Sequence, residues 1–204
     1  MGKIIITVGR EYGSGGRFVA KLVADKLGIK FYDKELIALS AQESNMSEKV
    51  IEDLDEKAAE RFFYALPATG YIPSSSSDFN LTMNDKLFLL QSNVIRNVAN
   101  KESAVIVGRA ADYVLRNNAG VLNVFIHAPL ETRVRNAVKN YGLNPVTAEK
   151  VVKKTDETRK KYYNYYTGKK WGDLNNYHLT VDSSLGTDAT VDVIVAAAKS
   201  LITK

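Results

Sequence analysis

Lys3-Ile4-Ile5-Ile6-Thr7-Val8 runs directly into Gly9-Arg10-Glu11-Tyr12-Gly13-Ser14-Gly15-Gly16-Arg17, and this junction decides the fold. The first run has the apolar composition of a buried strand, and an amphipathic stretch typical of a helix follows from about Gly15 to Leu27. Four of the eight residues from Gly9 to Gly16 are glycine. Glycines let backbone N–H groups converge on an anion, and a helix N-terminus adds roughly half a positive charge. The junction therefore predicts a phosphate-binding loop.

The loop departs from the usual phosphate-loop pattern G-x-x-x-x-G-K-[ST], whose lysine contacts the β- and γ-phosphates and whose hydroxyl binds Mg²⁺. With Gly13-Ser14-Gly15 on the second half of the pattern, Gly16 takes the lysine position and Arg17 takes the hydroxyl position. We expect Arg10 or Arg17 to supply the missing charge, with Gly16 giving room for the bulkier, planar guanidinium. The remaining candidates for Mg²⁺ ligation are Ser14, Asp33 and Asp112.

Composition narrows the class of protein. The chain has 204 residues, 45% of them hydrophobic, which predicts one domain with an inserted subregion. It has no cysteine and only two histidines, His127 and His178, so disulfides, thiolate metal sites and a dedicated metal cluster are not expected. No signal peptide or membrane span is apparent, so we expect a cytoplasmic protein. Segment 150–171 holds eight basic residues against two acidic ones, which indicates one anionic ligand site.

Hydrophobic patterning predicts strands that alternate with helices along most of the chain. Because the strand runs are apolar rather than alternating, they indicate an α/β fold with a parallel sheet that helices cover on both faces. Ligands bind beyond the carboxyl ends of such strands, so Gly9, Asp33, Gly108-Arg109 and His127-Ala128-Pro129 are expected to surround one cleft. The strands are expected at 3–8, 29–32, 103–107, 121–126 and 179–181. Helices are expected at 15–27, 34–43, 47–63, 81–99, 130–141, 147–163 and 190–201, with a loop at 67–78.

A family resemblance covers most of the chain. It is carried by residues 6–17, Phe31-Tyr32-Asp33-Lys34-Glu35-Leu36-Ile37, Val107-Gly108-Arg109, Ala128-Pro129-Leu130-Glu131-Thr132-Arg133, the basic tyrosine-rich segment and Val181-Asp182-Ser183-Ser184. Together these resemble the cytidylate kinase-like family of P-loop proteins, in a variant branch with Gly-Gly-Arg in place of Gly-Lys-Ser/Thr. The resemblance implies a P-loop NTPase fold with strand order 2-3-1-4-5. It further implies a single domain over 1–204, with a helical acceptor-binding insertion at 34–100 and a basic lid at 150–172.

The resemblance also assigns roles to residues. ATP, used with Mg²⁺, would lie on Gly9, Gly13, Ser14, Gly15, Gly16, Arg17 and Phe18. The acceptor side would be formed by Asp33, Arg109, Asp112, Asp156 and Arg159. The catalytic charges would be Arg10, Arg17, Arg109, Arg159, Lys160 and Lys161. A guanidinium suits these tasks because its fork matches phosphate oxygens.

The function implied is transfer of the ATP γ-phosphoryl group to a small acceptor, with a pyrimidine nucleoside monophosphate such as CMP or dCMP as the first choice. Two alternatives remain. One is a nucleotide sensor without turnover. The other is an RNA-binding module, because Tyr162-Tyr163-Asn164-Tyr165-Tyr166 lies among basic residues and aromatic rings can stack on bases. Membrane partners are not expected. More ordinary readings also stand: Asp33 could cap a helix, the lid lysines could form a solvated face, and both histidines are expected to be structural.

Overall fold

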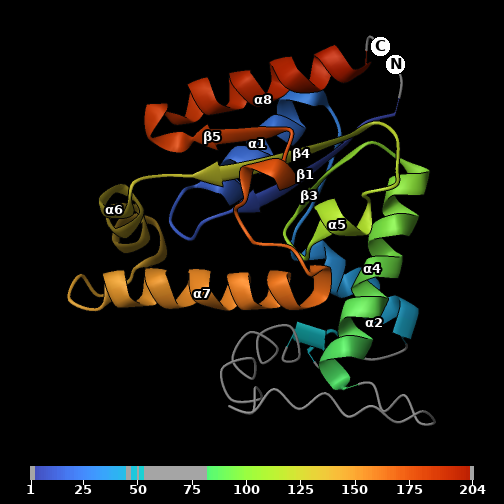
Figure 1. The fold of residues 1–204 in the computed structure, drawn as a ribbon, viewed down its shortest axis with the longest axis horizontal. Helices are drawn as coiled ribbons and strands as arrows, with labels where there is room; N and C mark the ends of the chain where they lie inside the picture. Colours follow the sequence, from blue (N-terminus) through green and yellow to red (C-terminus); the bar gives the residue numbers. More distant parts are fainter. Residues whose placement is uncertain (1–2, 45–46, 50, 53–81, 203–204) are drawn as a thin grey trace.

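The computed structural model describes residues 3–44, 47–49, 51–52 and 82–202. Five parallel strands form one sheet in the order β2-β3-β1-β4-β5 (Figure 1). This confirms the predicted α/β class and strand order. The strands are β1 (Ile5–Arg10), β2 (Lys30–Tyr32), β3 (Ala104–Val107), β4 (Val121–His127) and β5 (Leu179–Asp182). The loop predicted at 67–78 and most of the helix predicted at 47–63 lie outside the described residues.

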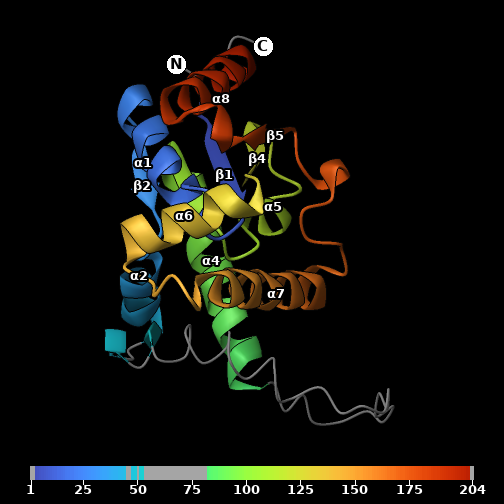
Figure 2. The same ribbon diagram turned by 90° about the vertical axis from the view of Figure 1, so that its left-hand side faces the viewer.

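Helices cover both faces of the sheet, as Figure 2 shows. The helices are α1 (Gly16–Leu27), α2 (Glu35–Ser44), α4 (Met83–Lys101), α5 (Ala111–Val114), α6 (Leu130–Tyr141), α7 (Ala148–Thr167) and α8 (Thr187–Ile202). Alternate residues of β1 face opposite sides, because successive side chains of a strand point to opposite faces. Ile4, Ile6 and Val8 pack with α1 and α8, whereas Ile5 packs with α2, α4 and α5. Burial of these apolar side chains stabilises the three layers.

The main differences from the sequence prediction are the end of α7, the start of α8 and one helix that was not predicted, α5. Helix α7 continues past Tyr163 to Thr167, because Tyr163 and Thr167 are buried and tertiary packing outweighs the weak helix preference of tyrosine and asparagine. It ends at Gly168, whose left-handed backbone lets its N–H bond to the Asn164 carbonyl. Helix α8 starts at Thr187 rather than at 190. The one-turn helix α5 was not predicted, since four residues are too short to give a hydrophobic period.

Helix α7 is the element that brings the basic segment to the sheet. Figure 1 shows it crossing beneath the sheet, from the end of α6 to the neighbourhood of α2 and α4. Its Arg159 bonds to the last residue of β1, which places the middle of the helix at the carboxyl end of that strand. Two short 3₁₀ turns, at 174–176 and 183–185, flank β5. Within the described ranges, no helix is both long enough and apolar enough to cross a membrane.

Candidate functional site

A cavity of about 740 Å³ is lined by residues at the carboxyl ends of β1, β2 and β3 and by residues of α7. Gly9, Asp33 and Arg109 all line it, so three of the four strand ends expected to meet do so. The fourth does not. His127, Ala128 and Pro129 line a separate hollow of about 570 Å³. Trp171 borders both spaces and packs edge-on against Phe125 of β4, with ring centroids 5.3 Å apart, which corrects the expectation of one cleft.

Four arginines from separate parts of the chain line the cavity: Arg10 of β1, Arg17 of α1, Arg109 of the turn between β3 and α5, and Arg159 of α7. The buried carboxylate of Asp33 lies among them. It accepts a hydrogen bond from Nε of Arg17 and lies 3.5 Å from Nη1 of Arg109. Burial alone would raise the pKa of Asp33, but the Arg17 hydrogen bond and the charges of Arg10 and Arg109 hold that pKa below its ordinary value. The cavity lining holds five cationic side chains, these four arginines and Lys34, against three carboxylates, Asp33, Glu52 and Asp112, and this excess of positive charge suits a phosphorylated ligand.

Arg10 occupies the room that Gly16 leaves. A Cβ atom built on Gly16 would lie 2.7 Å from Cβ of Arg10, and one built on Gly108 would lie 2.4 Å from Nη1 of the same arginine. The Arg10 side chain therefore passes over Gly16, at the start of α1, and reaches Gly108, beyond β3. Arg17 points instead to Asp33 and keeps a half-exposed side chain. Of the two candidates for the missing lysine charge, Arg10 is the one that uses the space at position 16.

The glycine-rich loop is held by hydrogen bonds within the protein. The Tyr12 N–H donates to Oδ1 of Asp156 at 2.7 Å, and the Ser14 N–H donates to the Glu11 carbonyl at 3.4 Å. The Ser14 hydroxyl donates to the same carbonyl at 2.8 Å and accepts from the Gly16 N–H at 3.3 Å. The Glu11 N–H also donates, to the Ile126 carbonyl at 3.0 Å, so four of the loop amides bind protein atoms, and the hydroxyl of Ser14 serves the loop's own conformation.

The outer side of the loop packs against α6 and the β5–α8 connection. The side-chain amide of Asn136 donates to the Gly13 carbonyl at 2.9 Å, and the Ser183 hydroxyl donates to the Ser14 carbonyl at 2.7 Å. Gly13 has φ +80°, and a Cβ atom there would lie 2.3 Å from the carbonyl oxygen of Arg133. Only glycine satisfies both conditions, so this glycine is required by the close approach of α6 as well as by the turn.

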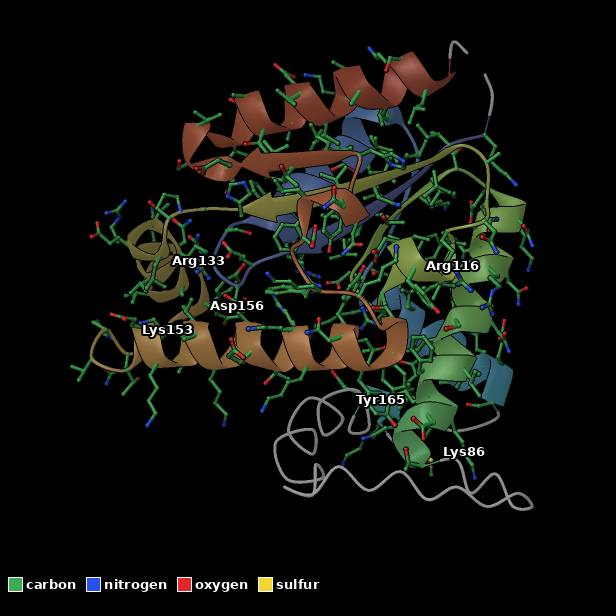
Figure 3. The ribbon with its side chains drawn as sticks, viewed as in Figure 1. Lys86, Arg116, Arg133, Lys153, Asp156 and Tyr165 are labelled. Carbon is green, nitrogen blue, oxygen red and sulfur yellow. The ribbon has the colours of Figure 1, made fainter. Side chains whose placement is uncertain are left out.

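Asp156 joins α7 to the loop and to α6. Nη1 of Arg133, a buried residue, donates to Oδ2 of Asp156, and Nε lies 3.2 Å from the Glu11 carboxylate. The same Nε donates to the Ala128 carbonyl at 3.0 Å. Figure 3 shows Arg133 and Asp156 facing each other between α6 and α7. Predicted as an acceptor-side residue, Asp156 has both its oxygens bonded to protein groups.

The three basic lid residues occupy different environments. Arg159 lines the cavity, donates to the Arg10 carbonyl at 3.1 Å and lies over the Tyr12 ring, with Cζ 5.5 Å from the ring centroid. Desolvation by burial lowers the pKa of Arg159, although the charge of Asp156 opposes this shift. Lys160 instead lies 3.2 Å from Glu157 on the same helix. In the part of the chain that the structure describes, neither Lys160 nor Lys161 borders the cavity.

The tyrosine-rich run is used mainly for packing. Tyr163 is buried, and Tyr166 stacks on Phe88 of α4 with ring centroids 4.1 Å apart and planes 9° from parallel. Tyr162 lines the cavity and packs edge-on against Tyr166, whereas Tyr165 is exposed. Rings packed in this way are not presented as a row for stacking bases. Phe18, predicted on the donor side, is exposed on the first turn of α1.

The predicted Mg²⁺ ligands do not come together as one set. Ser14 is bound within the loop, Asp33 is ion-paired with arginines, and Asp112 accepts a hydrogen bond from Tyr163 at 2.6 Å. Among the residues that the structure describes, no group of three histidine, aspartate or glutamate side chains could hold a metal ion. The described residues therefore hold no preformed cluster for a metal ion, and most of the positive charge at this cavity comes from guanidinium groups.

Sequence reasoning missed one feature of the site, a turn of left-handed residues after β3. Gly108, Arg109 and Ala110 have φ of +74°, +52° and +51°. Two of them are not glycine, and such residues adopt this conformation only where the surrounding structure imposes it. No residue type signals this turn, because arginine and alanine favour ordinary helix. The turn places Arg109 at the cavity and starts α5 at Ala111.

A parallel sheet of this order, with a glycine-rich loop between β1 and α1 and a basic helix across the strand ends, is the P-loop kinase fold. Among solved structures, a gluconokinase from Sinorhizobium meliloti 1021 is similar in fold, with 18% identity and a TM-score of 0.58 over 98% of this chain and 94% of that one. An uncharacterized protein from Eubacterium ventriosum ATCC 27560 is more similar, with 31% identity and a TM-score of 0.71 over 97% of this chain and 99% of that one.

The chain belongs to the Cytidylate kinase-like family, whose family model matches residues 5–185. This confirms the resemblance seen in the sequence. A relative named cytidylate kinase, from Methanopyrus kandleri, is 24% identical over 209 residues, which cover 98% of this chain and 95% of that protein. The family is one of kinase-like nucleotide phosphotransferases.

Proposed function

We propose that this protein transfers the γ-phosphoryl group of ATP to a small phosphorylated acceptor, and that a pyrimidine nucleoside monophosphate, CMP or dCMP, is that acceptor. The single observation that carries the proposal is the convergence of Arg10, Arg17, Arg109 and Arg159 on one cavity beside the glycine-rich loop. The cytidylate kinase named above, which is similar over nearly its whole length, supports the choice of acceptor.

Phosphoryl transfer depends mostly on positioning and on neutralising charge, and a single well-placed arginine can contribute about 10³–10⁵ in rate. In our proposal Arg10 takes the part of the missing lysine, because its side chain passes over Gly16. Arg159 then closes the site from α7, since it already bonds to the end of β1. Arg109 binds the acceptor phosphate, held by its contact with Asp33. ATP would be supplied to the assay as its Mg²⁺ complex.

A nucleotide sensor without turnover is the second candidate, and the Asp156 contact favours it. The Asp156 carboxylate already accepts from the Tyr12 N–H at 2.7 Å, so an incoming phosphate would have to displace it to use that amide. A protein that binds nucleotide through its arginines alone would orient the triphosphate less tightly than one that also uses the loop amides. An RNA-binding role receives little support, because most of the tyrosine rings are packed.

The test is phosphoryl transfer from Mg²⁺-ATP to CMP, dCMP, UMP, AMP and GMP, with calorimetric binding of each nucleotide measured in parallel. We expect transfer to a pyrimidine nucleotide in the wild type. Arg10→Ala and Arg159→Ala should lower kcat/KM by roughly 10³ or more. Arg96→Ala is the matched control, because Arg96 is exposed on α4 and bonds to Asn93. It should change neither turnover nor binding.

The outcomes separate the candidates. Binding without transfer to any acceptor would favour the sensor. Neither binding nor transfer would contradict both readings of the cavity. Arg17→Ala separates the two arginines near the loop: if it abolishes turnover while Arg10→Ala does not, Arg17 rather than Arg10 replaces the lysine.

A further inference from the structure

The left-handed turn after β3 presents two residues of opposite charge to the same cavity. Gly108, Arg109 and Ala110 all have positive φ, and the Ala111 N–H bonds back to the Gly108 carbonyl at 3.0 Å. Helix α5 then begins, so that Asp112, on its first turn, lines the cavity together with Arg109. Strained backbone of this kind is concentrated at sites where geometry serves binding or catalysis. The fold thus maintains an unfavourable backbone conformation at the turn that brings Arg109 and Asp112, three residues apart in the chain, to the same cavity.

Asp112 is held firmly but retains capacity to bind. Its Oδ2 accepts from the Tyr163 hydroxyl at 2.6 Å. A carboxylate has about four acceptor positions, so this one hydrogen bond leaves the group able to accept from a ligand as well. Asp112 is half-buried in the cavity wall, and its burial raises the pKa of the carboxyl group. Tyr163, which donates to this carboxylate, lines the cavity, and Tyr177 and Trp171 line it too, so ring surfaces are available to a ligand there.

We propose that Asp112 selects the acceptor by accepting a hydrogen bond from a hydroxyl or amino group of the molecule whose phosphate binds Arg109. This inference rests on the proposed function, because it takes the cavity to be the acceptor site. It narrows the substrate class to small phosphorylated molecules that carry a hydrogen-bond donor. A bound ligand would cover this half-buried carboxylate, and a ligand without a donor would leave it with an unmet acceptor, which is why it would discriminate between ligands.

Calorimetry tests the inference without requiring turnover. The ligands are CMP, dCMP, UMP and inorganic pyrophosphate, and the proteins are the wild type, Asp112→Asn and Asp188→Asn. Asp188 is a matched control because it also lies in the first turn of a helix, α8, but is exposed. A hydrogen bond to a charged group corresponds to roughly a ten- to hundredfold difference in Kd. We expect Asp112→Asn to weaken CMP by about tenfold while pyrophosphate binds equally or slightly more tightly, since a negative charge has been removed.

The choice of ligands identifies the donor group. If Asp112 binds a sugar hydroxyl, the wild type prefers CMP to dCMP and Asp112→Asn loses that preference. If it binds an amino group, the wild type prefers CMP to UMP, and the asparagine, whose amide can donate to the carbonyl of UMP, reduces or reverses the preference. Affinities for CMP and pyrophosphate that fall together would show that Asp112 only ties α5 to α7, which overturns the inference. A wild type that binds no nucleotide would instead overturn the proposed function.

Tyr163→Phe provides a second variant that keeps the carboxylate and the ring. It removes only the hydroxyl that donates to Asp112. With its fixing partner gone, the carboxylate should still prefer the same ligands but bind them more weakly. A Tyr163→Phe protein that changes CMP and pyrophosphate binding equally would also contradict the inference.

Discussion

Replacing Gly16 by alanine tests whether Arg10 uses the space of the missing lysine. Gly16 is the first residue of α1 and does not have positive φ, so its backbone suits alanine. On helix preference alone, the change should stabilise the protein by about 0.5–1 kcal/mol. The new Cβ, however, would lie 2.7 Å from Cβ of Arg10, an atom fixed to β1 rather than at the end of a flexible side chain.

The magnitude follows from the two opposing effects. Overpacking of this kind costs about 1–3 kcal/mol, so the net effect should be a loss of roughly 1–2 kcal/mol in the free energy of unfolding. In a chain of this size, that corresponds to a fall of about 3–6 °C in Tm. The measurement is thermal unfolding, repeated in urea. Gly16→Lys, which restores the lysine of the usual motif but not its Ser/Thr, should be at least as unstable and should not improve nucleotide binding.

Two backgrounds make this prediction refutable. Arg10→Ala keeps the Cβ atom, so adding Gly16→Ala to it should still destabilise the protein. Arg10→Gly removes the Cβ atom and leaves Ile126 Cβ as a neighbour at 3.3 Å, so the added alanine should then be close to neutral or stabilising. If Gly16→Ala raises Tm in the wild type, or costs the same in both backgrounds, the steric argument is wrong.

Three further predictions concern the parts that hold the site. Gly13→Ala should cost about 3 kcal/mol or more in unfolding free energy, because φ is +80° and the new Cβ would meet a backbone oxygen at 2.3 Å. Gly142→Ala is the control: φ is +67° but the space is open, so the cost should be about 1 kcal/mol. Asp156→Ala should lower Tm by about 6–9 °C, because the buried Arg133 loses one of its partners. Glu157→Ala, which removes only the exposed ion pair with Lys160, should lower Tm by no more than about 2 °C. The pKa of Asp33 is lowered by folding, so its ion pairs stabilise the protein above the ordinary value of 3.8 and this contribution is lost as pH falls further. Urea unfolding between pH 3 and 6 should show the wild type losing stability relative to Asp33→Asn at the acid end, and parallel profiles would contradict this.

Hydrophobic periodicity was sufficient to predict the sheet and most of the helices. The run from Ile4 to Val8 is buried on both sides, as its composition indicates, and the order of the strands followed from the family resemblance. Strand ends also placed Asp33 and Arg109 at one cavity. Contacts between distant residues could not be predicted in this way. That Asp156 accepts from the Tyr12 N–H depends on where α7 lies, 144 residues further along the chain, and no local pattern contains that information.

Local sequence was equally insufficient to predict which basic residues of α7 face the cavity. A count of basic residues in segment 150–171 predicted an anionic site but could not distinguish Arg159 from Lys160, which are adjacent in sequence. A helix advances about 100° per residue, so neighbours face different directions, and here only the arginine of the two faces the cavity. The lysine pairs with Glu157 instead. Predicting this would have required knowing which face of α7 packs on the sheet.

Gly16 and Arg10 are best understood as one change rather than two. A loop with glycine at position 16 and no arginine at position 10 would lack the lysine charge and would leave the space at position 16 without a guanidinium beside it. A loop with lysine at 16 and arginine at 10 would force two side chains into the same space, since Cβ atoms would lie 2.7 Å apart. Each residue therefore makes sense only with the other, and the guanidinium extends on to Gly108, where absence of a side chain again leaves it room. A double-mutant cycle between Gly16→Ala and Arg10→Gly, which removes the Cβ atom, should consequently give a coupling energy of about 1–2 kcal/mol, well above the few tenths expected of independent sites.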